Sequence, residues 1–332
     1  MSDALPSVDV VIPAYNEERH IGRCLDCVLA QDYPRDLLNV WVVDAGSDDR
    51  TAEHVQARAS ADARVHVLGG NGRRLMHAEA LSTGIAAGRA PLVARVDART
   101  FVEPQHVRRA VEVFASEGDA LGAVGGDIVH EGETPFGRAV ALARNSRAGV
   151  GASVFAERSR RRHVDTALCP VYRRAALDAV GGFDPAMAYG EDEELHWRLR
   201  RAGWTIVLDA GMPMHYLARD NFGAVFRQYR NYGAGRVRVV RRHPSFLRPY
   251  HLVPSAAAAA GATLAVLGTR SAAARRALLA GGGLYAAVVG GAAVAAARPH
   301  GGARLAARVA TAMFALHAGY AVGTLREAAR GR

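Results

Sequence analysis

Residues 10–18 read VVIPAYNEE, an apolar run that passes directly into a polar turn and then into a helical pattern. This order predicts a β-strand followed by a helix, and junctions of this kind are where open α/β sheets bind nucleotides. A second junction follows at residues 41–51, WVVDAGSDDRT, where another apolar run ends at Asp44 in an acidic turn that contains glycine. The ends of the two strands are therefore expected to line one crevice.

Short β-branched runs alternate with helical patterns from residue 8 to about residue 220. The expected strands are Val8–Ile12, Val40–Val43, Val65–Leu68, Leu92–Val96 and Leu121–Gly126. Such alternation predicts an α/β fold in three layers, with a mostly parallel sheet and helices on both faces. We place this domain at residues 1–221, a basic and aromatic segment at 222–250, and a hydrophobic C-terminal region at 251–332.

The composition allows a large core and narrows the choice of partners. Half of the 332 residues are hydrophobic, the formal charge is +10, and every Lys or Arg position is an arginine. Nucleic acid is not indicated as a partner, because the sequence has no RNA-binding aromatic motif, zinc finger or helix-turn-helix pattern. The arginines cluster late in the chain beside apolar segments, so anionic lipid or a diphosphate is the better match.

The cysteines do not indicate a disulfide framework, because there are three of them, Cys24, Cys27 and Cys169, in a long chain. Cys24 and Cys27 form a Cys-x-x-Cys pattern inside an amphipathic helix, where packing in the core is a better explanation than zinc or redox chemistry. The N-terminal segment, residues 1–8, is short and polar and does not resemble a signal peptide. We therefore expect the N-terminal domain to stay in the cytoplasm.

The C-terminal region indicates attachment to the cell membrane. Aromatic residues mix with arginines between residues 222 and 250, which suits a membrane surface. Three apolar stretches follow, Leu252–Thr269, Ala277–Ala297 and Leu305–Leu325, each close to the ~20 residues that span a bilayer. We expect a multi-pass protein with about three membrane helices. The first stretch is short and the third contains Arg308 and His317, so a surface or packed helix is the alternative for each of these two. Arginines lie on every side of these stretches, so the positive-inside rule does not decide the topology.

The two strand–turn motifs, VVIPAYNEE and VVDAGSDDRT, resemble in this order the opening of family 2 glycosyltransferases with the GT-A fold. The resemblance implies that Pro13, Tyr15, Glu17 and Asp44 hold the nucleotide of a sugar donor. The alternative is a generic βα turn, which a single PAYN motif would not exclude. Two motifs in the correct order, together with those described below, favour the family.

The family usually carries an Asp-x-Asp motif where this chain has Asp97, Ala98 and Arg99. In the family pattern the two carboxylates face the ribose and a divalent cation on the diphosphate, and hard cations prefer such oxygen ligands. Arg99 cannot ligate a cation, so either Asp97 acts with other ligands or the guanidinium neutralises part of the diphosphate charge. The resemblance implies Mg²⁺ or Mn²⁺, with His215 at the place of a histidine ligand in many GT-A enzymes. An isolated histidine is otherwise more often structural.

Residues 95–100, RVDART, resemble the RVDAHT pattern of an ExoA-like subgroup of the family, in which the second aspartate is also absent. Later segments agree with that subgroup: QYRNYGAGR at 228–236, RRHP at 241–244 and HAGYAVG at 317–323. Processive relatives carry Gln-x-x-Arg-Trp at the first of these segments, and Asn231 and Tyr232 depart from it. We assign Gln228 and Tyr232 to the acceptor side, with an interfacial anchor as the alternative role of the rings.

The resemblance places the catalytic base in residues 190–194, GEDEE, which open a predicted helix. Asp192 matches the aspartate of the family's Glu-Asp motif, which removes a proton from the acceptor hydroxyl during inverting transfer. A sugar hydroxyl is a poor nucleophile until its proton is taken, so a nearby carboxylate is the minimum requirement. Glu191 and the upstream Gly182 are assigned to the acceptor side, while a plain turn is an equal alternative for the glycine.

The same acidic residues have a structural alternative, because carboxylates at the start of a helix are favoured by its dipole. We prefer this interpretation for Glu193 and Glu194, and Glu194 can form an i,i+4 pair with Arg198. Leu195 and Leu199 then share one face, and Gly203 can end the helix.

These observations lead to one hypothesis. The protein is a membrane-attached inverting glycosyltransferase that moves a hexose from a nucleotide diphosphate sugar, expected to be a UDP-sugar, to a lipid-linked saccharide. Transfer to a polyprenyl phosphate is the nearest alternative. A non-catalytic membrane scaffold that binds the nucleotide sugar is another, suggested by Arg99, and the presence of Glu191 and Asp192 argues against it.

Overall fold

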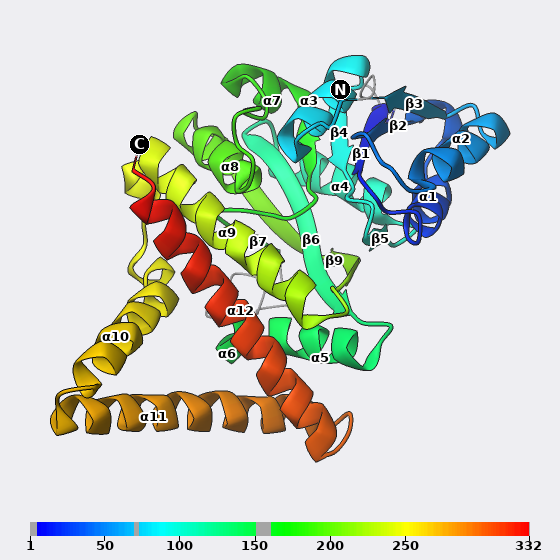
Figure 1. Ribbon diagram of the computed structural model, residues 1–332. Helices are drawn as coiled ribbons and strands as arrows, with labels where there is room; N and C mark the ends of the chain where they lie inside the picture. The colour runs from blue at the N-terminus through cyan, green and yellow to red at the C-terminus, as the bar shows by residue number, and fades with distance from the viewer. Residues whose placement is uncertain (1–4, 70–72, 151–160, 332) are drawn as a thin grey trace. The chain divides into compact units, whose positions relative to one another are not determined.

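The computed structural model describes residues 5–69, 73–150 and 161–331. The chain divides into two compact units, and each is described by itself. The first unit combines Met1–Val129 with Glu157–Tyr216, and the second combines His130–Ala156 with Leu217–Arg332. Nearly all of the sheet belongs to the first unit, whereas the second is helical (Figure 1).

Four parallel strands form one half of the sheet, in the order β3-β2-β1-β4. They are β1 (Val8–Ala14), β2 (Leu38–Asp44), β3 (Val65–Gly69) and β4 (Leu92–Arg95). Every residue of β1 and β4 is buried, as is typical of parallel strands that are covered on both faces. Ala14 pairs with Asp44, so the turns after β1 and β2 leave the sheet at the same edge.

The other half of the sheet is antiparallel and corrects the expectation of a mostly parallel sheet. It contains β5 (Thr100–Val102), β6 (Leu121–Glu131), β7 (Arg162–His163), β8 (Val171–Arg173) and β9 (Thr205–Leu217). The order runs from β4 through β8, β6 and β9 to β5, with β7 also beside β9. An apolar run shows that a strand is buried but not its direction, which depends on the connections. The α/β fold class is confirmed, with a mixed sheet.

The helices of the first unit surround this sheet. They are α1 (Ile21–Leu29), α2 (Thr51–Ala61), α3 (His77–Ala87), α4 (His106–Glu117), α7 (Arg174–Val180) and α8 (Glu191–Arg201), with a 3₁₀ turn, η1 (Arg35–Leu37). α3 packs closely on β1, because a Cβ at Gly84 would overlap the side chain of Val11. Cys24 is buried on the packed face of α1, and it is free, as are Cys27 and Cys169.

The second unit is built from helices that share one apolar core. They are α5 (Pro135–Arg144), α6 (Arg147–Val150), α9 (Phe222–Arg242), α10 (Val253–Gly268), α11 (Ala272–Ala297) and α12 (Ala303–Ala329), with 3₁₀ turns η3 (Pro244–Phe246) and η4 (Pro249–His251). Val140, Val225, Val289, Met313 and Leu316 contribute to this core from α5, α9, α11 and α12. Within the described ranges, α11 and α12 are long and apolar enough to cross a membrane, whereas α10 is shorter.

Candidate active site

Hydrogen bonds join the turns that follow β1 and β2. Asn16 has a φ of 53°, in the left-handed region that asparagine tolerates better than most residues. Its backbone N–H donates to Ser47 Oγ at 3.0 Å, and its Oδ1 accepts from the backbone N–H of Asp48 at 3.0 Å. The backbone N–H of Glu17 donates to Thr51 Oγ1 at 2.8 Å. The two turns therefore form one continuous rim at the edge of the sheet.

Three residues assigned to the nucleotide belong to this rim. Pro13 lies near the end of β1, and Asp44 is the last residue of β2. Asp44 Oδ1 accepts a hydrogen bond from the backbone N–H of Ser47 at 3.1 Å, which holds the carboxylate at the strand end. The half-buried ring of Tyr15 is covered by the Arg74 guanidinium, 4.0 Å from the ring centroid, a cation–π distance. The predicted nucleotide residues thus meet at one edge.

Glu17 and Arg99, both assigned to the donor side, are paired with each other. Arg99 Nε donates to Glu17 Oε1 at 2.8 Å, and the two side chains are 18% and 11% exposed. Sequence reasoning named both residues but did not predict their contact, which joins positions 82 apart. The pair brings the turn after β4 to the turn after β1.

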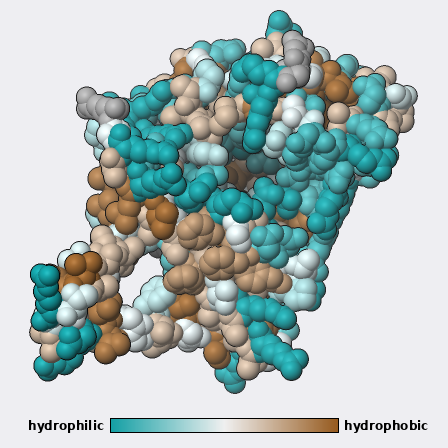
Figure 2. All heavy atoms as spheres, in the orientation of Figure 1, coloured by the Kyte–Doolittle hydropathy of each residue, from teal (hydrophilic) through white to brown (hydrophobic). Residues whose placement is uncertain are grey.

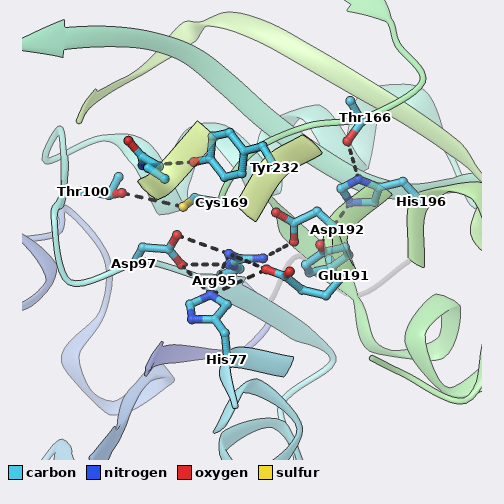
Figure 3. A network of polar contacts seen from close by, with 12 residues as sticks. His77, Arg95, Asp97, Thr100, Thr166, Cys169, Glu191, Asp192, His196 and Tyr232 are labelled. Atoms are coloured by element: carbon cyan, nitrogen blue, oxygen red, sulfur yellow. Dashed lines mark hydrogen bonds and ion pairs between the residues drawn. The ribbon is translucent and has the colours of Figure 1, made fainter. Parts of the chain in front are cut away.

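Arg95 is the centre of the polar network in Figure 3. It is the last residue of β4, and its side chain is only 4% exposed. Its Nε donates to Asp97 Oδ1 at 2.8 Å, and its Nη1 donates to Asp192 Oδ1. Its Nη2 lies 2.8 Å from His77 Nε2. Burial lowers the pKa of His77, but the carboxylates of Asp97 and Glu191, 3.6 and 3.8 Å from the same nitrogen, outweigh it and raise that pKa above its usual value.

Three carboxylates share the single guanidinium of Arg95. Besides Asp97 and Asp192, Glu191 Oε1 lies 3.6 Å from Nη2. Burial opposes ionisation of Asp97, but the charge of Arg95 outweighs it and holds the pKa of Asp97 well below its usual range. Burial raises the pKa of Asp192 to about 7, and Glu191 and Asp97 add to this effect while Arg95 and His77 oppose it. Asp192 is therefore the member of the group that can exchange a proton near neutral pH.

The start of α8 fixes the position of Asp192. Gly190 precedes the helix with a φ of 80°, a left-handed conformation that favours glycine. Glu191 and Asp192 then fall in the first turn, where the helix dipole favours negative charge. Leu195 and Leu199 are fully buried and anchor the helix.

Glu194 has the structural role that the sequence suggested, but in a buried setting. It is 2% exposed and pairs with Arg198 at 2.6 Å, the i,i+4 contact expected. Arg198 also donates to the carbonyl oxygens of Val180 and Gly182, at 2.5 and 2.7 Å. Gly182 has a φ of 68°, so the predicted acceptor-side loop is held against α8 in a conformation that disfavours other residues.

A buried aromatic layer lies behind Asp192. The Tyr172 hydroxyl is 3.0 Å from His196 Nε2, and Thr166 Oγ1 is 2.8 Å from His196 Nδ1. Burial lowers the pKa of His196 to about 3, so the imidazole is neutral at physiological pH. Tyr172 and His196 are fully buried, and burial raises the pKa of Tyr172 well above its usual value, with the charge of the nearby Asp192 adding to this effect.

Sequence reasoning did not identify Arg95 or His77 as members of the site. The one available indication was an arginine inside the otherwise apolar run LVARV, because a charge in a buried strand requires a partner. His77 carried no such indication, since it is the first residue of an ordinary helix, α3.

The predicted metal ligands have other partners. Both oxygens of Asp97 contact Arg95, at 2.8 and 3.2 Å. His215 lies within β9, and its Nε2 is 2.9 Å from Glu103 Oε1. In the part of the chain that the structure describes, no three His, Cys, Asp or Glu side chains are grouped so as to hold a metal ion. These residues do not fit a resident cation held by protein groups alone.

The two remaining acceptor-side residues belong to the second unit. Gln228 and Tyr232 lie one turn apart on α9, and Gln228 Nε2 donates to Tyr232 Oη at 3.1 Å. Tyr232 is 43% exposed and also stacks edge-on against Tyr229. Their role towards an acceptor stays a prediction.

Comparison with known proteins agrees with this geometry. The family model for glycosyl transferase family 2 matches residues 9–181, which include both nucleotide-side turns, Arg95 and Asp97. This chain belongs to glycosyl transferase family 2. It is therefore a glycosyltransferase, and the recognition made from its motifs is confirmed.

Two curated relatives cover most of their own length and most of this chain. The succinoglycan biosynthesis protein ExoA of Rhizobium meliloti (strain 1021) is 32% identical over 80% of this chain and 81% of its own. The dolichyl N-acetyl-alpha-D-glucosaminyl phosphate 3-beta-D-2,3-diacetamido-2,3-dideoxy-beta-D-glucuronosyltransferase of Methanococcus voltae is 20% identical over 71% and 74%. Family 2 relatives of this glycosyltransferase thus act in polysaccharide and lipid-linked glycan synthesis.

A solved structure supports the fold over the whole chain. The mannosyltransferase PcManGT from Pyrobaculum calidifontis, in complex with GDP-Man and Mn²⁺, has a TM-score of 0.67 and covers 99% of this chain and 89% of its own. The sequences are 19% identical, so the likeness concerns the fold. It confirms the GT-A type of the glycosyltransferase.

Proposed function

We propose that this glycosyltransferase transfers a hexose from a nucleotide diphosphate sugar, expected to be a UDP-sugar, to a lipid-linked saccharide, with inversion at the anomeric carbon. The main support for this proposal is the side chain of Asp192. It is a buried carboxylate that contacts Arg95, and its pKa is about 7. A general base is most effective when its pKa lies near the working pH. Asp192 combines that property with its place in the Glu-Asp motif of the family.

In the proposed reaction the acceptor hydroxyl oxygen attacks the anomeric carbon of the donor. Its proton passes to the carboxylate of Asp192, and the bond between the anomeric carbon and the diphosphate oxygen breaks. The nucleoside diphosphate leaves with that electron pair, so a single displacement completes the transfer without a covalent enzyme intermediate. Pro13, Tyr15, Glu17 and Asp44 hold the nucleotide.

Arg95 connects the two sides of this reaction. Its guanidinium binds Asp97, on the donor side, and Asp192, the base, through different nitrogens. A planar fork of donors holds two carboxylates in fixed directions, which a lysine would not do. Arg95 is thus a positioning residue that aligns the base with the donor. Arg99, paired with Glu17, lies on the donor side, where its guanidinium helps to bind the diphosphate of the nucleotide sugar.

The expected Mg²⁺ or Mn²⁺ stays a prediction for the donor-bound enzyme. The structural relative crystallised with Mn²⁺ suggests such an ion, although the protein groups described here do not hold one by themselves. Turnover in the presence of EDTA, with Mg²⁺ or Mn²⁺ added back, tests it. Full activity in EDTA would show that arginine charge is sufficient.

The printed names of the relatives favour a lipid-linked saccharide as the acceptor. The Methanococcus enzyme is named for transfer to a sugar on dolichyl phosphate, and the Rhizobium protein for succinoglycan biosynthesis. We further propose that the enzyme is attached to the cell membrane with its catalytic domain in the cytoplasm, because two apolar helices follow that domain.

The test is sugar incorporation by membranes that contain the protein, with UDP-sugars offered one at a time and the lipid extract analysed. The proposal expects a product in which the new sugar is joined to another sugar. A product with the new sugar joined directly to polyprenyl phosphate would favour the alternative acceptor. Donor binding without incorporation into native lipid acceptors would favour the scaffold.

A further inference from the structure

The charges are distributed unequally along the chain. Residues 1–220 contain 26 arginines and 31 acidic residues, whereas residues 221–332 contain 16 arginines and one acidic residue, Glu327. Residues 221–332, called the basic segment below, contain the helices α9, α10, α11 and α12, and the last three of these helices are strongly apolar. Excess positive charge beside apolar helices favours contact with anionic lipid headgroups.

α12 lies against α9 at very short range. A Cβ at Gly323 would overlap the carbonyl oxygen of Arg230, and a Cβ at Gly319 would lie 2.6 Å from the carbonyl oxygen of Phe226. On the other helix, a Cβ at Gly233 would overlap the carbonyl oxygen of Tyr320. Small residues at these positions allow the backbones to approach, and the two helices run side by side (Figure 1).

The only acidic residue of the basic segment fastens the end of α12 to α9. Glu327 Oε1 accepts from Arg238 Nε at 2.8 Å, and the side chain of Glu327 is 9% exposed. The backbone carbonyl of Glu327 accepts from Arg241 Nη2 at 2.8 Å. Arg241 Nη2 also donates to the carbonyl of Ala328 at 3.3 Å, so two arginines of α9 hold the last turn of α12.

A crossing of the bilayer by α12 would draw α9 into the hydrocarbon with it. The arginines on α9 are Arg227, Arg230, Arg236, Arg238, Arg241 and Arg242. An arginine at the centre of a membrane helix is costly to insert, and α9 carries six of them. Four residues separate β9 from α9, so α9 also stays on the side of the membrane where the catalytic domain is. α9 and α12 therefore belong to the membrane surface.

α11 has the opposite character. Every residue from 279 to 288 is exposed, on all sides of the helix, and the segment LAGGGLYAAV is apolar apart from the hydroxyl of Tyr285. A Cβ added at Gly281, Gly282 or Gly283 would meet no atom within 4 Å. A helix that is apolar on all sides needs an apolar environment around it.

The arrangement of α10, α11 and α12 leaves room for that environment. Figure 1 shows the three helices as an open triangle, and in Figure 2 no side chains fill the opening. Val266 and Leu267, near the end of α10 that leads into α11, are also apolar and exposed. Arg270, Arg275 and Arg276 gather at the corner between these two helices, where Figure 2 shows hydrophilic side chains next to apolar ones.

We propose that α10 and α11 form a hairpin inserted into an anionic membrane, and that α12 returns to lie on the membrane surface along α9 without crossing. Acyl chains surround residues 279–288 of α11, and headgroup phosphates pair with the arginines of α9 and of the corner between α10 and α11. This topology replaces the three spans expected from hydropathy alone. It does not depend on which donor or acceptor the enzyme uses.

Lipid fits this surface better than a second copy of the chain. A second copy would bring another 16 arginines, with one acidic residue, to the same face, and like charges in contact repel. Anionic headgroups supply the opposite charge and attract each arginine near the surface.

The test is the sidedness of single introduced thiols in intact cells and in inside-out membrane vesicles, read with a membrane-impermeant maleimide. Gly301→Cys reports on the junction between α11 and α12, and Gly331→Cys on the end of α12. Ser60→Cys, exposed on α2, marks the side of the catalytic domain. The wild-type protein gives the background from its native cysteines, and retained glycosyltransferase activity shows that each variant is folded.

The proposal expects the thiols introduced at positions 301 and 331 to react only from the side on which the thiol at position 60 reacts. Three spans would place residue 331 on the opposite side, and crossing by α11 and α12 alone would place residue 301 there. Either result would overturn the surface position of α12.

Leu284→Cys distinguishes lipid from a second copy of the chain as the partner of α11. The Leu284 side chain is 68% exposed, so a thiol at this position faces whatever surrounds the helix. The proposal expects the new thiol to be unreactive in native membranes, reactive once detergent is added, and unable to form an oxidative dimer. Ready dimer formation, or labelling by the impermeant reagent without detergent, would contradict lipid as the partner.

Discussion

Arginine serves opposite purposes in the two units. In the first unit, Arg95 is nearly inaccessible, and the carboxylates of Asp97, Glu191 and Asp192 more than balance its charge. In the helices after residue 221, sixteen arginines face one acidic side chain, Glu327, and the excess charge is available to a partner. The same side chain thus orders acidic groups inside the catalytic unit and attracts an anionic surface outside it. Net charge alone does not distinguish the two uses.

The largest effect should follow from removing the buried charge. Arg95→Met leaves three carboxylates without their counter-charge, so we expect a loss of about 3–5 kcal/mol of folding stability and at least a hundredfold loss of turnover, on the order of a misplaced catalytic group. Thermal unfolding and sugar incorporation measure these effects. Arg50→Met is the matched control, because Arg50 forms an exposed pair with Glu53 that is worth about 0–1 kcal/mol. Equal losses in both variants would contradict the special position of Arg95.

Arg95→Lys separates the effect of charge from the effect of geometry, because it keeps the positive charge and removes the planar set of hydrogen-bond donors. We expect the stability to recover more than the turnover, since a lysine neutralises the carboxylates but does not align two of them. Full recovery of turnover would show that charge without direction is sufficient.

The next effect is a dependence of turnover on pH. Asp192 accepts a proton only when it is ionised, so kcat/KM should fall about tenfold for each pH unit below about 7 and reach a plateau above it. The groups around Asp192 are Arg95, His77, Glu191 and Asp97, with Tyr172 behind it. A profile that stays flat between about pH 5 and pH 8 would contradict the role of Asp192 as the base.

The same pKa makes a prediction for stability. The pKa of Asp192 is raised in the folded protein, so the stability from its bound proton is complete below about pH 4 and is lost as the pH rises through about 7. Asp192→Asn cannot lose that proton. We expect the variant to gain stability relative to the wild type as the pH rises from about 5 to about 8, measured by denaturant unfolding. The same pH dependence in both proteins would contradict the shift.

A smaller effect, of about 1–3 kcal/mol, is expected in the second unit. Gly323→Leu places a side chain where the carbonyl of Arg230 lies, so α12 must separate from α9. Gly282→Leu is the matched control, because nothing lies near its Cβ position. Protease resistance of the C-terminal helices in membranes should fall only in the first variant.

The smallest effect concerns the edge of the donor side. Arg99→Gln removes a partly exposed charge from the pair with Glu17, so we expect about a fivefold increase in KM for the nucleotide sugar with little change in kcat. Glu53→Gln, on the surface of α2, is the control. A large loss of kcat with unchanged KM would assign Arg99 to the chemical step instead.

The sequence predicted the parts of the fold that depend on local pattern. The five apolar runs became strands, and the helix that begins at Glu191 ended as expected before Gly203. The antiparallel half of the sheet was not predicted, because β8 and β9 pair with strands that are distant in sequence and an apolar run carries no direction. The sequence left α12 undecided between a membrane span and a surface helix, since its glycines fit α9 as well as they would fit another membrane helix.

The candidate site was predictable where a motif names a residue and not where the fold supplies a neighbour. Asp44 and Asp192 were found from motifs that surround them in sequence. The contact between Arg95 and Asp192 joins residues 97 positions apart and depends on β4 and α8 meeting in the folded chain. The pairing of Glu17 with Arg99 depends on the sheet order in the same way.

The most direct test of the account is the turnover of Asp192→Asn, with UDP binding measured in the same preparation and Glu193→Gln as the matched control from the same helix turn. A positioned general base contributes about 10²–10⁴-fold. The account predicts a loss of that size in Asp192→Asn with UDP still bound, and near wild-type turnover in Glu193→Gln. Turnover in Asp192→Asn within about threefold of the wild type would contradict the assignment of Asp192 as the base.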